Sequence, residues 1–226
     1  KLLIIFDLDD TLIDTSGSIL PGVLRNALKE MEGVGLTMAN FNRSYEELLR
    51  LNMFHTSSKD ALKEFLEINR APKSCLDVAL DVVYERPVFE GSIQPVEDAI
   101  EVLEDLSKSH PLVLVTKGKE KIQREKMKRA GISTQFFTKL YFCADGEKKK
   151  IYQKVSEEMG ISPLNALVCG DRISLDLTPA KSLGYKTVQI KWGRGLGNTG
   201  FKKDVDYTIL HLKELQTLLE TLKIVG

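Results

Sequence analysis

Three carboxylates near the start of the chain are the residues best suited to chemistry. Residues 3–6 are Leu-Ile-Ile-Phe, and Asp7, Asp9 and Asp10 follow them closely. A short apolar run bounded by polar residues predicts a strand buried on both faces, and ligands of open parallel sheets bind beyond the carboxyl ends of the strands. Alternation along an extended chain would turn Asp7 and Asp9 to one side and Asp10 to the other. Because paired carboxylates repel, we expect a divalent cation between them, with Mg²⁺ the first choice.

Further polar residues follow apolar runs later in the chain. Thr116 ends the run that begins at Pro111, and Asp171 comes soon after the run at residues 166–169. An Asp or Thr at the end of a strand is about as often a helix cap or turn residue as a functional group. The carboxyl ends of parallel strands meet at one edge of a sheet, so we expect these groups to converge there with the first carboxylates.

The order and spacing of these residues resemble the motifs of the haloacid dehalogenase superfamily. Residues 7–11, Asp-Leu-Asp-Asp-Thr, look like its first motif, DxDx[TV], and residues 170–176, Gly-Asp-Arg-Ile-Ser-Leu-Asp, look like its fourth, GDxxxxD. Thr116 resembles the second motif, and a lysine of the run at 148–150 resembles the third. The resemblance covers nearly the whole chain and is to C1-capped, phosphoglycolate phosphatase-like members.

The resemblance implies phosphoryl transfer through an aspartyl-phosphate. Asp7 would be the nucleophile, and Asp9 would protonate the leaving oxygen and later accept a proton from water. Thr116 would hydrogen-bond a phosphoryl oxygen. Lys148 would supply positive charge to the phosphate; it is favoured over its two neighbours because the apolar pair at 151–152 then aligns with that of the family. These four residues are the predicted catalytic groups.

The same resemblance implies a Mg²⁺ site made of carboxylates from both ends of the chain. Asp7, the backbone carbonyl of Asp9, and Asp171 would ligate the ion. Asp176 would complete the site by orienting a metal-bound water or the lysine. Asp10 stands where the family usually has glycine, and we expect no direct catalytic part for it. Dehalogenase members lack an acid at the position of Asp9, so its presence favours a phosphatase.

The pattern of elements predicts a core interrupted by an insertion. Strands and helices alternate after Pro87, with residues 95–106 among the helices, which is typical of a parallel sheet covered by helices. We therefore expect an α/β, Rossmann-like core of residues 1–15 and 88–226. An all-helical cap domain would occupy residues 16–87. The glycine-rich stretch at 193–200 does not open a helix after a first strand, so we expect a surface connection there and no dinucleotide site.

Composition narrows the classes of partner. The 226 residues carry 32 basic and 32 acidic side chains, and this zero net charge gives no reason to expect nucleic acid or an anionic membrane as a partner. Three scattered cysteines form neither a metal spacing nor a disulfide framework. We expect a cytoplasmic enzyme, monomer or homodimer, that acts on a small phosphorylated metabolite.

Three functions remain open at this point. The first is a Mg²⁺-dependent phosphatase acting on a small phosphomonoester. The second is a phosphomutase of the same family, a sugar-phosphate isomerase, which would rearrange its substrate without releasing phosphate. The third is a binding module switched by Asp phosphorylation. The helical insertion after the first strand argues against the third.

Overall fold

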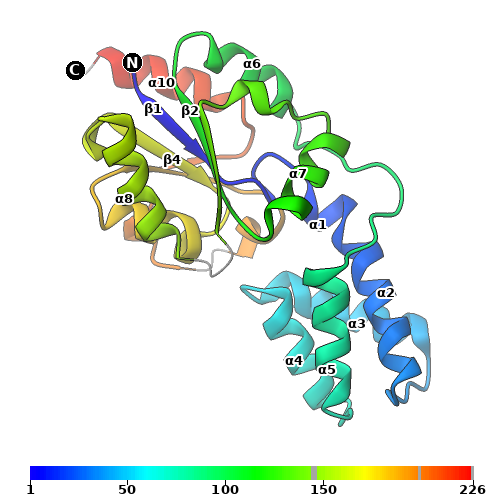
Figure 1. Ribbon diagram of the computed structural model, residues 1–226. Helices are drawn as coiled ribbons and strands as arrows, with labels where there is room; N and C mark the ends of the chain where they lie inside the picture. Colours follow the sequence, from blue (N-terminus) through cyan, green and yellow to red (C-terminus); the bar gives the residue numbers. More distant parts are fainter. Residues whose placement is uncertain (144–146, 198–199, 225–226) are drawn as a thin grey trace. The chain divides into compact units, whose positions relative to one another are not determined.

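The computed structural model describes residues 1–143, 147–197 and 200–224 (Figure 1). The described chain forms two compact units. The first combines residues 1–14 with residues from 93 onward, and the second consists of residues 15–92. Each unit has its own buried core, so each is considered by itself below.

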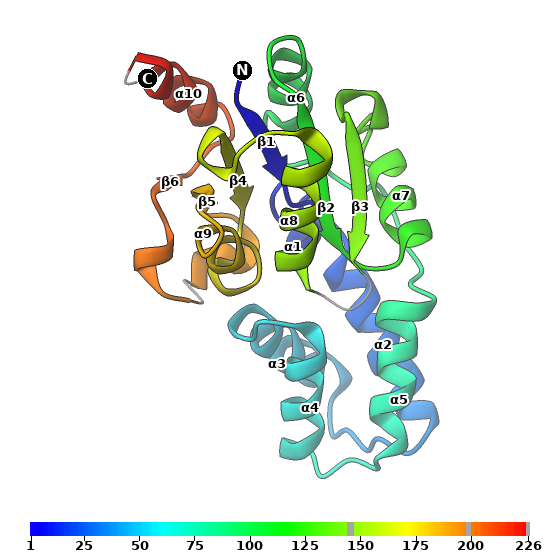
Figure 2. The same ribbon diagram turned by 60° about the vertical axis from the view of Figure 1, so that its left-hand side comes forward.

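A parallel sheet of six strands forms the centre of the first unit. The strand order is β3-β2-β1-β4-β5-β6, so β1 lies between β2 and β4, where the order reverses (Figure 2). Its partners are in register, with Ile5 opposite both Val113 and Val168. The strands are β1 (Leu3–Phe6), β2 (Leu112–Lys117), β3 (Lys139–Cys143), β4 (Ala166–Gly170), β5 (Lys186–Ile190) and β6 (Tyr207–Ile209). The predicted α/β fold class is confirmed, and the crevice at the reversal point is where such sheets bind ligands.

Helices cover both faces of this sheet, as right-handed crossovers require. On one face, side chains of α8 and of the segment from η4 to α9 pack on alternate residues of β1, β2 and β4. On the other side of the unit, Lys213, just before α10, forms ion pairs with Asp98 and Glu101 at the start of α6. The helices are α6 (Ala99–Ser107), α7 (Glu120–Arg129), α8 (Lys148–Met159), α9 (Thr178–Lys181) and α10 (Glu214–Ile224), with short turns η2 (Thr134–Phe136), η3 (Pro163–Asn165), η4 (Ile173–Leu177), η5 (Gly193–Gly197) and η6 (Lys202–Asp204).

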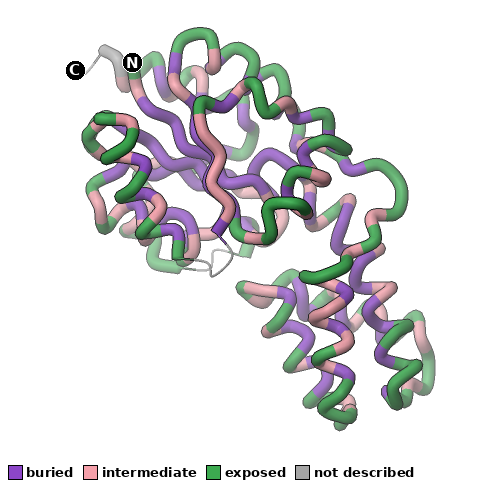
Figure 3. The backbone as a smooth tube through the Cα atoms, in the orientation of Figure 1, coloured by how far each residue is buried: buried purple, intermediate pink, exposed green. Residues whose placement is uncertain are grey.

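Burial along the strands follows their position in the sheet. The central strands β1 and β4 are buried at every residue, whereas most residues of the edge strand β3 are only partly buried (Figure 3). Continuous apolar sequence is therefore needed only in the centre, because only there are both faces covered. This explains why residues 3–6 and 166–169 carry the clearest strand signals in the sequence.

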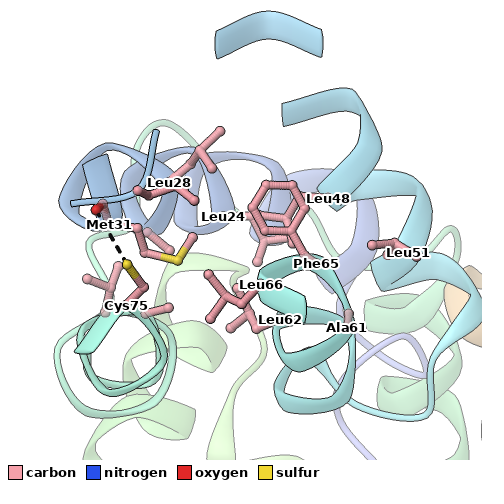
Figure 4. Close-up of a cluster of buried hydrophobic side chains, with 14 of the residues drawn as sticks. Leu24, Leu28, Met31, Leu48, Leu51, Ala61, Leu62, Phe65, Leu66 and Cys75 are labelled. Atoms are coloured by element: carbon pink, nitrogen blue, oxygen red, sulfur yellow. Dashed lines mark hydrogen bonds between the residues drawn. The ribbon is translucent and has the colours of Figure 1, made fainter. Parts of the chain in front are cut away.

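The second unit, at residues 15–92, is helical throughout its regular structure. Apolar side chains spaced one helical turn apart face a common core that includes Leu28, Leu48, Phe65 and Cys75 (Figure 4). Asn40 and Ser57 cap the second and third long helices through their side chains. The elements are α1 (Thr15–Ser18), α2 (Leu20–Gly33), α3 (Phe41–Phe54), α4 (Ser58–Ile68), α5 (Ser74–Leu80) and η1 (Asp81–Glu85). Its role as a cap domain stays a prediction.

Two local expectations differ from the structure. The helix predicted at 95–106 begins only at Ala99, because Pro95 pairs with Ile13 and Asp98 has the left-handed φ of 63°. Strand β1 ends at Phe6, and Asp10 has a φ of 57°. The alternation expected along Asp7, Asp9 and Asp10 therefore does not hold, since it requires extended backbone through all of them.

Candidate active site

Asp7 lies at the carboxyl end of the central strand. Its backbone N–H donates to the carbonyl of Cys169 (3.0 Å), which extends the pairing of β1 with β4 by one bond. Its side chain is 2% exposed, and Lys148 Nζ lies 2.5 Å from its Oδ1. Asp7 is therefore held in place through both its backbone N–H and its side-chain carboxylate.

Lys148 is the first residue of α8 and bridges two buried carboxylates. Its Nζ lies 2.5 Å from Asp7 Oδ1 and 2.6 Å from Asp176 Oδ1, and the residue is 2% exposed. Lys149 and Lys150 are exposed. The structure therefore brings to the carboxylates the lysine that the alignment of the following apolar pair favoured.

Asp171 and Asp176 come from the segment that follows β4. Asp176 is fully buried, and its Oδ2 accepts the backbone N–H of Arg172 (3.0 Å). Gly170 makes this close packing possible, because a Cβ there would lie 2.7 Å from the Cβ of Asp176. Asp171 does not cap the following turn, since that turn has no side-chain cap. The alternative reading of Asp171 as a helix cap is therefore wrong.

The described carboxylates of Asp7, Asp171 and Asp176 form one buried acidic group. One oxygen from each lies within 4.8 Å of the others. Asp171 Oδ1 is buried and has no hydrogen-bond partner among the described residues; Arg172 Nε is 3.8 Å away. A buried carboxylate oxygen without a partner is costly unless a cation or proton satisfies it. The group thus offers the hard oxygen ligands that Mg²⁺ prefers, so the residues present fit that ion.

Burial dominates the electrostatics of this group. It raises the pKa of Asp7 to about 6, although the charge of Lys148 acts in the opposite direction. It also raises the pKa of Asp171 well above the usual range, against the opposing charge of Arg172. For Lys148 burial acts to lower the pKa, but Asp176 and Asp7 outweigh it and raise the pKa. In the described residues the acids are in excess, which is the condition for binding a divalent cation.

Asp9 and Thr116 lie against α7 rather than in the buried acidic group. Gln123 Nε2 lies 2.8 Å from Asp9 Oδ2 and 2.7 Å from Thr116 Oγ1. Lys126 Nζ lies 2.8 Å from Asp9 Oδ1. Neither Gln123 nor Lys126 is among the site residues predicted from the sequence. The sequence feature that could have indicated Gln123 is its position on the apolar side of a short amphipathic helix that follows Thr116.

Asp10 and the glycine-rich stretch pack together. Asp10 is 3% exposed, and a Cβ on Gly193 would lie 2.3 Å from its Cγ. Gly195 is buried as well. The expectation of a surface connection is therefore wrong for Gly195, whereas Gly193 is partly exposed and Leu196 is exposed. The left-handed φ of Asp10 gives a physical reason for the glycine that the family usually has there. Asn198 and Thr199, in the same stretch, lie outside the described residues.

None of the helices in the described part of the chain combines the length and the apolar character that crossing a bilayer requires.

Comparison with known proteins identifies the family. The family described as "Haloacid dehalogenase-like hydrolase" matches residues 4–190. A glyceraldehyde 3-phosphate phosphatase of Pyrococcus furiosus is 31% identical, with 96% of this chain and 92% of that protein covered. A protein of the same name from Methanocaldococcus jannaschii is 28% identical, with 97% of each chain covered. These relatives agree with the reaction class predicted from the four motifs.

Solved structures share the fold over nearly the whole chain. A predicted phosphoglycolate phosphatase from Haemophilus somnus has a TM-score of 0.73 at 17% identity, with 96% of this chain and 97% of that chain covered. The HAD-hydrolase YfnB from Bacillus subtilis, bound to magnesium, has a TM-score of 0.64 at 19% identity, with 97% and 98% covered. Together with the sequence match, this shows that the chain belongs to the haloacid dehalogenase-like hydrolase family and is a phosphatase.

Proposed function

We propose that this chain is a Mg²⁺-dependent phosphatase that hydrolyses a small phosphomonoester through a phosphoryl group carried by Asp7. The observation that supports this most is the carboxylate of Asp7, buried against Lys148 and within reach of the acidic pair Asp171 and Asp176. A carboxylate that is held in place, charge-balanced and placed at the reversal point of a parallel sheet suits a nucleophile.

In the first step an oxygen of Asp7 attacks phosphorus while the bond from phosphorus to the leaving oxygen breaks. Asp9 transfers its proton to that oxygen, so the product leaves as a neutral alcohol. Thr116 donates its hydroxyl hydrogen to a phosphoryl oxygen. Lys148 offsets the negative charge of the phosphoryl group next to Asp7.

In the second step water attacks phosphorus, and the bond between phosphorus and Asp7 breaks. Asp9, left ionised by the first step, takes the proton of the attacking water. Inorganic phosphate leaves, and Asp7 and Asp9 return to their starting states. Splitting the displacement in two allows a single carboxylate to serve as acid and then as base.

Asp7 and Asp171 would hold Mg²⁺ together with the backbone carbonyl of Asp9, and Asp176 would support the site through Lys148. The ion would supply charge neutralisation for the carboxylates and the phosphate when bound. Asp171 Oδ1, which has no hydrogen-bond partner among the described residues, supports this assignment.

The names of the relatives support a choice of substrate class. Several archaeal proteins similar to this chain are named glyceraldehyde 3-phosphate phosphatase. We infer that a triose phosphate or a comparably small ester is the first substrate to test. The helical unit at residues 15–92 is the proposed cap, which would exclude water and select the leaving group.

A phosphate-release assay with purified protein tests the proposal. The wild type is expected to release inorganic phosphate from glyceraldehyde 3-phosphate and from p-nitrophenyl phosphate when Mg²⁺ is present. Asp7→Asn is expected to abolish both activities, with folding checked by circular dichroism. EDTA should stop turnover, and added Mg²⁺ should restore it. Isomerisation of a sugar phosphate without release of phosphate would instead establish the phosphomutase alternative.

A further inference from the structure

The face of α7 that carries Gln123 holds the predicted proton donor in place. Gln123 is 1% exposed, and its Nε2 lies within hydrogen-bond distance of three oxygens. These are Asp9 Oδ2 at 2.8 Å, Thr116 Oγ1 at 2.7 Å and the carbonyl of Lys117 at 3.1 Å. A single buried amide therefore joins the carboxylate of the first motif to the hydroxyl of the second.

The orientation of this amide follows from its neighbours. The carbonyl of Lys117 can only accept a hydrogen bond, so the NH₂ end of Gln123 must face it. The amide nitrogen does not accept, so Thr116 Oγ1 is the acceptor in its contact with Gln123, and the two hydrogens of Nε2 are shared among the three oxygens. The hydroxyl hydrogen of Thr116 stays available for donation to an anionic oxygen, which is the direction that binding a phosphoryl group requires.

Lys126 holds the second oxygen of the same carboxylate. It follows Gln123 by three residues, and side chains at this spacing lie on the same side of a helix. Its Nζ is 2.8 Å from Asp9 Oδ1, and the two side chains are 13% and 20% exposed. Asp9 is therefore anchored through both oxygens to one rigid element, and it differs in this from an exposed carboxylate that samples several rotamers.

We propose that Gln123 and Lys126 are positioning residues that hold Asp9 for proton transfer, and that Gln123 also orients the Thr116 hydroxyl. The inference rests on the proposed function, because it assigns the two residues a part in that reaction. A general acid acts only when it lies within hydrogen-bond reach of the leaving oxygen. Neighbouring residues that fix the rotamer of the acid keep it in that position.

A purely structural role of the same contacts makes a different prediction. If Gln123 only packs α7 against the sheet, its replacement should lower kcat/KM by the same factor for all substrates. If Gln123 positions the acid, Asp9, the decrease in kcat/KM should depend on the leaving group of the substrate. An alkyl ester must have its leaving oxygen protonated, whereas p-nitrophenolate is stable enough to leave without a proton.

The test compares kcat/KM for glycerol 3-phosphate, an alkyl ester, with kcat/KM for p-nitrophenyl phosphate. This parameter covers the steps up to phosphoryl transfer to Asp7, so slow hydrolysis of the phosphorylated enzyme does not mask the effect. Gln123→Met keeps a similar volume without the donors. Lys126→Met removes the second anchor at a partly exposed position. Lys128→Met, at an exposed position of the same helix, is the matched control.

We expect Gln123→Met to lower the alkyl-to-aryl ratio of kcat/KM about tenfold or more, and Lys126→Met to lower it in the same direction. Asp9→Asn should show the largest fall, and the Lys128 variant should keep the wild-type ratio. An unchanged ratio in folded Gln123→Met or in Lys126→Met overturns the inference while leaving the proposed function in place. A wild type that hydrolyses neither ester refutes the proposed function, and the inference fails with it.

Discussion

Replacing Asp7 by asparagine should stabilise the metal-free protein at neutral pH. Burial raises the pKa of Asp7 from 3.8 to about 6 in the folded chain. The folded state therefore holds this proton more tightly than the unfolded state, and stability falls as pH rises from about 4 to above 6. Asparagine resembles the protonated carboxyl in size and charge, so the variant should escape this loss.

The size of the effect follows from the difference in pKa. About two pKa units correspond to about 3 kcal/mol at pH 8, where Asp7 is ionised in both states. At pH 5 Asp7 is still ionised in the unfolded chain but mostly protonated in the folded chain. About half of the difference in the free energy of unfolding between variant and wild type should therefore remain. Near pH 4 the variant and the wild type should be nearly equal in stability.

Urea unfolding in EDTA at pH 8, 6 and 5 measures this difference. Asp206→Asn is the control with the opposite sign, because the hydrogen bond from Lys181 helps to hold the pKa of Asp206 below its usual value despite partial burial. That carboxylate contributes stability above its unfolded pKa, and the contribution is lost as pH falls, so its replacement should destabilise the protein at neutral pH. An Asp7→Asn variant that is less stable than the wild type at pH 8, or a difference independent of pH, would refute the reasoning.

Three further changes probe the site, the packing of Asp10 against Gly193 and the core of the helical unit. Lys148→Met leaves Asp7 and Asp176 buried without their shared cation, so urea unfolding at pH 8 should show a loss of about 3–5 kcal/mol; a loss below about 1 kcal/mol would contradict the pairing. Gly193→Ala places a Cβ 2.3 Å from Asp10 Cγ at a backbone φ of 51°. It should lower the melting temperature, and Asp10→Gly in the same chain should recover part of the loss; no recovery would contradict the contact. Phe65→Ala opens the core of the helical unit, where we expect a loss of about 3–5 kcal/mol by urea unfolding; a neutral effect would show that the unit repacks.

Strands and motif positions were predictable because they depend on local sequence and on a general property of parallel sheets. The apolar runs at 3–6 and 166–169 became the buried strands β1 and β4, since only central strands need apolar residues on both faces. Asp7 and Asp171 then had to lie near each other, because both follow adjacent parallel strands at their carboxyl ends. In the structure, burial raises the pKa of both carboxylates.

The local course of the backbone beyond β1 could not be predicted in the same way. Alternation would have separated Asp10 from Asp7 and Asp9, but it applies only to extended chain, and the strand ends before the first carboxylate. Asp10 instead turns into a left-handed conformation and lies against Gly193, almost two hundred residues away. Such a contact depends on tertiary packing, so no local sequence pattern around Asp10 predicts it.

The order and spacing of the carboxylates, Thr116 and the lysine run were enough to predict the family, the sheet and the reaction class, because these follow from strand ends and short motifs. Tertiary packing settled which oxygen each side chain meets. It placed Lys148 between Asp7 and Asp176, left Asp171 Oδ1 without a hydrogen-bond partner among the described residues, and brought Gln123 and Lys126 against Asp9. The physical reason is distance along the chain: these contacts join residues that are unrelated in local sequence, and they form only when separate elements pack together.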